Sequence, residues 1–158
     1  MTPAQLQTLK AYIESVPEWM AMPNNSDTSY FIAGELNKEA VPAFIVWKSN
    51  VDKNEVGKAF VASALAAITA GNNDKLANFA AWNETVNPSR LDQRAFFDDI
   101  FSVAAGASTR AALLVLWKRS ATLLEKIFAT GTGSDASPAT MVVEETVSYQ
   151  TIDQARSL

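Results

Sequence analysis

Apolar residues recur at spacings of three and four in several separate stretches of this chain, and Pro, Gly or Asn separates each stretch from the next. Leu6, Leu9 and Ile13 share one face of a helix that Thr2 and Pro3 are suited to begin. A single amphipathic helix cannot bury its own apolar face and needs another element to pack against. The spacing therefore predicts short amphipathic helices that pack against one another.

The same spacing predicts several further helices. One contains Tyr30, Ile32 and Leu36, and a long alanine-rich helix runs from residue 62 to about Trp82. The alternative for the second is a break at Gly71, because glycine costs about 1 kcal/mol in a helix interior. The remaining helices are predicted over residues 88–103 and 109–129. Three tryptophans are predicted to lie in the core: Trp47, Trp82 and Trp117.

Two segments have the pattern of strands. Residues 43–47 are apolar, aromatic and partly β-branched, and follow Pro42. Residues 141–151 alternate apolar and polar side chains, with Glu145 interrupting the apolar face. A single strand needs a partner, so either these two segments pair or each pairs with another chain.

These elements predict a mainly α fold, a bundle of about four to five helices with a short strand near 43–47 and an extended or β C-terminal arm. Residues 1–130 are expected to form the bundle domain. Residues 131–158 are expected to form a flexible linker followed by the arm, because residues 131–138 are rich in Gly, Ser and Thr and end in Pro. Deleting residues 134–158 is then expected to leave the bundle folded.

The amino-acid composition excludes several kinds of bond, metal site and catalytic mechanism. The chain has no Cys and no His, which excludes disulfides, thiolate metal sites and Ser-His-Asp or Cys-His catalysis within it. The net charge is −4, a poor match for a nucleic-acid-binding protein. Charge is uneven: residues 109–130 sum to +3 and residues 131–158 to −3, so the tail either pairs with a basic helix or is simply solvated.

Candidate catalytic groups are few. Asp98 and Asp99 are adjacent, with Asp92 nearby, but neighbouring helical residues point about 100° apart and do not converge on a metal ion. Residues 131–134 lack the lysine and the strand–helix context of a phosphate-binding loop. We therefore expect no enzyme activity, no cofactor and no bound metal.

Candidate interface residues are easier to find. Met141, Val143, Val147 and Tyr149 need a surface to bury against, and a partner surface or the chain's own body can supply it. Three basic residues on the predicted 109–129 helix can form a stripe, or simply its polar face: Arg110, Lys118 and Arg119. Trp19, in a short segment between Glu18 and Met20, is either a core residue or an interface residue.

Several stretches resemble a family of small proteins encoded by tailed bacteriophages and prophages. The likeness is strongest over residues 86–150 and also includes 1–3 and 46–48. At residues 122–126, where the family pattern is TRAEK, this chain has TLLEK and lacks one basic position. The stretches that carry the resemblance are VNPSR (86–90), DQR (92–94), FFDDIF (96–101), TRAALL (109–114), LWKR (116–119), LEK (124–126), FATGTG (128–133), SPAT (137–140) and SYQ (148–150).

The resemblance implies a role in the virion or its assembly and brings no catalytic motif. By analogy with portal adaptors, a helical body with a C-terminal arm favours a head–tail connector that assembles as a homo-oligomeric ring and binds portal, neck or tail proteins. The alternatives are a capsid decoration protein or, less favoured, a small enzyme in which Asp92, Asp98 and a third acid converge.

The expected location is the host cytoplasm during assembly and then the virion. The first ten residues lack the basic and apolar regions of a signal peptide, and the longest apolar runs are far shorter than the ~20 residues of a bilayer span. No membrane partner and no sequence-specific nucleic acid are expected.

Overall fold

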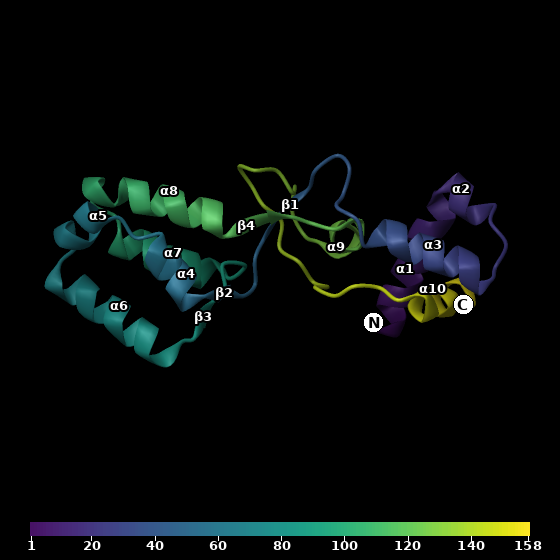
Figure 1. Cartoon of the computed structure of the whole chain (residues 1–158), viewed down its shortest axis with the longest axis horizontal. Helices are drawn as coiled ribbons and strands as arrows, with labels where there is room; N and C mark the ends of the chain where they lie inside the picture. Colours follow the sequence, from purple (N-terminus) through teal and green to yellow (C-terminus); the bar gives the residue numbers. More distant parts are fainter. The chain divides into compact units, whose positions relative to one another are not determined.

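The computed structural model describes all residues from 1 to 158, and Figure 1 labels the helices and strands in order. The chain is mainly helical and forms two compact units. Unit 1 consists of residues 1–46 and 120–158, and unit 2 of residues 47–119. In sequence, unit 2 is inserted between the two halves of unit 1. This division differs from the predicted one, in which residues 1–130 form a single helical body.

Unit 1 contains five helices, four of which begin at a residue whose side chain caps the first turn. At two of them, Thr2 with Gln5 and Thr122 with Glu125, the bonding is reciprocal and forms a capping box. The helices of unit 1 are α1 (Pro3–Ser15), α2 (Pro17–Met20), α3 (Ser26–Leu36), α9 (Leu123–Phe128) and α10 (Tyr149–Arg156).

Unit 2 contains five short α-helices, one 3₁₀ turn and a two-stranded antiparallel sheet in which Val51 pairs with Val86. Its core gathers aromatic side chains, with Phe97 packed edge-on to Trp117 at 5.5 Å between ring centroids. Its elements are β2 (Val51–Asp52), α4 (Lys53–Lys58), α5 (Ala62–Ala67), α6 (Ala70–Trp82), β3 (Thr85–Val86), α7 (Leu91–Ile100), η1 (Ala104–Gly106) and α8 (Ala107–Leu116).

The chain passes between the units within two paired strands, β1 (Ile45–Trp47) and β4 (Lys118–Ser120). The Ala121 amide donates to the Phe44 carbonyl at 2.8 Å, and the Lys48 amide donates to the Trp117 carbonyl at 2.8 Å. These bonds continue the ladder beyond both ends of the strands. The partner of β1 is therefore β4 and not the 141–151 segment.

The predicted bundle of four to five helices is wrong. The structure has ten shorter helices and two small antiparallel sheets, distributed over two units. The predicted 62–82 helix is two helices, because Thr69 caps a new one by accepting from the Asn72 amide at 3.2 Å. The predicted 109–129 helix is interrupted by β4, because residues 118–120 pair with β1 and Thr122 then caps α9.

The predicted extended C-terminal arm is also wrong. Residues 141–147 have no strand, and α10 follows, capped by the Ser148 hydroxyl, which accepts from the Thr151 amide. Ile152 and Ala155 on α10 are fully buried against α1 and α3. The tail is thus part of the hydrophobic core of unit 1, so we now expect deletion of residues 134–158 to unfold that unit.

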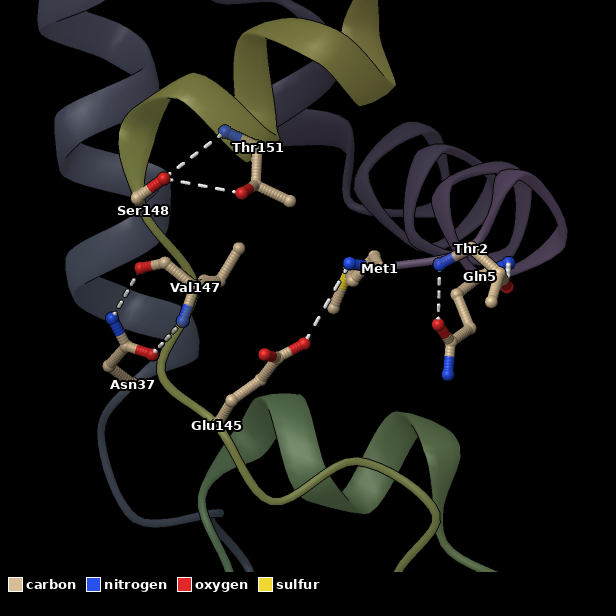
Figure 2. A network of polar contacts seen from close by, with 8 residues as sticks. All are labelled: Met1, Thr2, Gln5, Asn37, Glu145, Val147, Ser148 and Thr151. Carbon is tan, nitrogen blue, oxygen red and sulfur yellow. Dashed lines mark hydrogen bonds and ion pairs between the residues drawn. The ribbon is translucent and has the colours of Figure 1, made fainter.

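A side-chain contact fixes where this tail lies (Figure 2). The Asn37 amide group donates to the Val147 carbonyl at 2.9 Å and accepts from the Val147 amide at 2.9 Å. The side chain therefore satisfies both backbone groups of a residue 110 positions away in the sequence. It holds the chain in place directly before the cap of α10.

The segment predicted as a flexible linker is a closed loop. Thr130 and Thr140 exchange two backbone hydrogen bonds of 2.9 Å, and the Ile45 amide and carbonyl bond to Gly133 at 2.7 Å and to Ala139 at 2.9 Å. Gly133 has a φ of +65°, and the Phe44 ring occupies the place of a Cβ. Only glycine fits this position, so backbone geometry rather than flexibility explains its presence.

None of the helices combines the length and the hydropathy that a membrane span requires.

We predict that Asn37→Ala destabilises the protein, because both backbone groups of the half-buried Asn37–Val147 contact lose their partner. The expected loss is about 1–3 kcal/mol in the free energy of unfolding, measured by urea denaturation. Asn73→Ala is the matched control, because Asn73 is exposed on α6 and its side chain makes no hydrogen bond; we expect a change within about 0.5 kcal/mol. Equal midpoints for the two variants would contradict this role for Asn37.

We also predict that α6 opens more readily than α3. No side chain of α6 is fully buried, whereas α3 buries five. Hydrogen exchange followed by mass spectrometry is expected to show earlier exchange over residues 70–82 than over residues 26–36. Phe79→Ala should accelerate exchange in α6 further, and Trp82→Ala should not, since Trp82 is 88% exposed.

Candidate functional site

The apolar residues predicted to contact a partner are mostly inside the protein. Met141, Val143 and Val147 are 9%, 5% and 5% exposed. Val143 and Val147 belong to the main core of unit 1, and Met141 to a smaller cluster with Val46 and Ala139. These residues are buried against the chain's own body, which is one of the two possibilities that the sequence left open.

The two aromatic candidates differ from each other. Trp19 is 8% exposed and packs edge-on against Tyr12 at 6.1 Å, so it is a core residue. Tyr149 is half-buried and its ring stacks on that of Tyr30 at 4.1 Å, with 19° between the planes. Tyr30 is 61% exposed, so this pair reaches the surface.

The three basic candidates do not form one stripe on a helix. Arg110 lies on α8 and donates to the carbonyls of Phe101 and Val103, where it satisfies backbone groups beyond the end of α7. Lys118 and Arg119 lie in β4 and are half-buried. The helical periodicity that placed them together fails because β4 interrupts the helix.

The acidic candidates are dispersed. Asp92 pairs with Arg90 at 2.6 Å, and this hydrogen bond is the main cause that lowers the pKa of the Asp92 carboxyl. Asp99 pairs with Lys75 on α6 at 3.1 Å. No three acidic side chains are placed to hold a metal ion. The arrangement does not bring Asp92, Asp98 and a third acid together.

An apolar groove of about 430 Å³ lies in unit 2. It lies between α4 and α6, with β3 and α7 contributing the remaining walls. We call it the α4–α6 groove. Its main apolar lining residues are Val56, Phe60, Leu76, Phe79, Val86 and Phe97.

Small residues on both helices leave this groove open. Gly57 on α4 and Ala77, Ala80 and Ala81 on α6 line it, and a Cβ on Gly57 would meet no atom within 4 Å. Aromatic packing joins α6 to α7, where Phe79 stacks on Phe96 with 4.9 Å between ring centroids. The groove is the space that larger side chains would otherwise fill.

The groove contains one charged side chain. Lys53 donates to the Glu84 carboxylate at 2.9 Å and to the Ala80 carbonyl at 3.4 Å. Just before α4, Asp52 accepts from the Asn54 amide at 2.7 Å, and this backbone hydrogen bond lowers the pKa of the Asp52 carboxyl. The lining is therefore suited to apolar side chains, without a cluster of titratable groups for catalysis.

Exposed apolar residues lie in the same unit as the groove. Trp82 ends α6 and is 88% exposed, and Leu91 begins α7 and is 72% exposed. Trp47 and Trp117 are buried as predicted, but the prediction for Trp82 was wrong. α6 ends at Trp82, and nothing covers the ring.

Comparisons with family models, with curated proteins and with solved structures return no match for this chain.

Proposed function

We propose that this protein is a structural component of a tailed-phage virion, at the head–tail connection, and that it acts by binding other virion proteins. The resemblance over residues 86–150 supports the phage assignment. The α4–α6 groove supports the mode of action, because it is an open apolar surface in the unit that also exposes Trp82.

The apolar lining of the groove is the observation that supports a binding role. Protein interfaces are centred on well-packed apolar pockets and aromatic anchors, often tryptophan. A partner side chain that enters the groove contacts Leu76 and Phe79 and displaces water from apolar walls. The single lysine of the lining is already paired, so it leaves no uncompensated charge against an apolar partner.

The proposal no longer relies on a C-terminal arm, since α10 belongs to the core of unit 1. The groove takes its place as the surface that binds a portal, neck or tail protein. Gly57 and Ala77 are important for this binding because residues this small leave the groove open.

Copy number in purified virions tests the assignment. We expect quantitative mass spectrometry to find the protein at the copy number of a single ring, far below that of the major capsid protein. A copy number comparable to the major capsid protein would instead identify a decoration protein. Absence from the particle would contradict both roles.

Gly57→Leu tests the groove. The substitution adds bulk at a residue that lines the groove; a Cβ on Gly57 meets no atom within 4 Å, and leucine is the better helix former. We expect a folded protein and at least a tenfold loss of complete virions in a complementation assay, because the larger side chain occupies space that the partner would use.

The matched control is Gly71→Leu. Gly71 also lies in a helix of unit 2 with open space around its Cβ, but it does not line the groove. Virion yield should stay at the level of the unmodified protein. Equal losses with both variants would show that the groove has no particular role.

A further inference from the structure

Unit 1 has a groove of its own, between α1 and α9. Thr8 and Tyr12 line it from α1, and Leu123 and Ile127 line it from α9. The two residues of each pair are four positions apart, so they lie one turn apart on the same face of their helix. Lys126 completes the lining, and the volume is about 400 Å³. We call this hollow the α1–α9 groove.

The core of unit 1 holds both walls of the groove in place. Leu9 on α1 and Leu124 on α9 are fully buried in this core. Three groove residues are themselves partly buried against it: Tyr12, Leu123 and Ile127. Because both helices are anchored in a close-packed interior, the groove is present before a ligand binds, and a ligand does not have to order it.

The one charged side chain of the lining has no counter-ion. The Lys126 ammonium lies 5.8 Å from the centroid of the Phe44 ring, a distance at which an aromatic ring attracts a cation. No carboxylate or carbonyl group of the chain accepts a hydrogen bond from it. Lys53 in the α4–α6 groove differs, because Glu84 pairs with it. Lys126 is therefore free to donate to an anionic ligand.

The other polar groups of the lining are few. The Thr8 hydroxyl donates to the Ala4 carbonyl within α1 at 3.1 Å. The Tyr12 ring packs edge-on against Trp19, and its phenol has no hydrogen-bond partner. Small-molecule sites typically combine mainly apolar walls with a few polar groups, in a volume of about 300–1,000 Å³. The α1–α9 groove has both properties.

The extent of the groove favours a small ligand over a protein. It follows each helix for about one turn, ~6 Å along the axis. Five residues line it, whereas a stable protein interface uses about 20–30 residues on each side. A hydrocarbon chain suits the apolar walls, and a carboxylate supplies the negative charge that Lys126 lacks.

We propose that the α1–α9 groove binds an aliphatic carboxylate, with the hydrocarbon chain between the two walls and the carboxylate on the Lys126 ammonium. Charge complementarity selects the head group, because Lys126 is the only charged residue of the lining. Burial of the hydrocarbon chain supplies most of the affinity. The site goes beyond the proposed function, which uses a groove in unit 2, so either proposal can fail while the other stands.

Isothermal titration calorimetry of the full chain with sodium decanoate, below its micelle concentration, tests the proposal. We expect saturable binding. Octanoate should bind about tenfold more weakly, since each buried methylene changes affinity about threefold to fourfold. Decyltrimethylammonium, with the same chain and a cationic head, should bind at least tenfold more weakly than decanoate. Failure of decanoate to bind, or equal binding of the anionic and cationic compounds, would overturn the proposal.

Lys126→Met tests the head group, because it removes the ammonium and keeps a long side chain. Decanoate should bind about tenfold more weakly to this variant, and decyltrimethylammonium should bind no more weakly than before. Lys10→Met is the matched control: it removes the same charge from unit 1, but Lys10 pairs with Glu14 and does not line the groove. Equal losses in both variants would show that net charge, and not the Lys126 ammonium, attracts the ligand.

Thr8→Phe tests the walls. Thr8 is exposed and its hydroxyl bonds only within α1, so we expect an unchanged thermal unfolding midpoint and at least a tenfold loss of decanoate affinity. Gln7→Phe makes a similar change at an exposed neighbour outside the groove and should bind decanoate normally. Equal affinities in the two variants would contradict the site. If decanoate does not bind and Thr8→Phe lowers virion yield, the groove is a protein contact and the ligand proposal is wrong.

Discussion

The contact between Asn37 and Val147 is the constraint on which unit 1 depends. Without it, residues 141–148 have no strand or helix to fix their course between the closed loop at 130–140 and α10. Both backbone groups of Val147 are bonded to Asn37, and the next residue, Ser148, caps α10. Ile152 on α10 then lies in the core of unit 1. One polar side chain at the end of α3 thus helps to place the last apolar residues in the core.

Local signals predicted some elements well. The capping pair Thr2 and Gln5 and the spacing of Leu6, Leu9 and Ile13 correctly indicated α1, because every one of these interactions lies within the helix. In contrast, β4 could not be predicted from its neighbourhood. Apolar residues keep helical spacing across Lys118–Ser120, and only pairing with the distant β1 converts this stretch into a strand.

The candidate site was harder to predict for a related reason. An apolar residue that needs burial gives the same sequence signal whether its partner is the same chain or another chain. Met141 and Val143 were therefore assigned to an interface, although the core of unit 1 covers them. The α4–α6 groove is lined in part by small residues such as Gly57 and Ala77. Small residues form a groove only when two helices face each other, so the sequence of either helix alone does not predict it.

The α4–α6 groove depends on a different physical force from the polar Asn37–Val147 contact. The groove is apolar, and the burial of apolar surface does not weaken as ionic strength rises. Binding of a virion partner in this groove, as proposed above, would therefore persist as ionic strength rises.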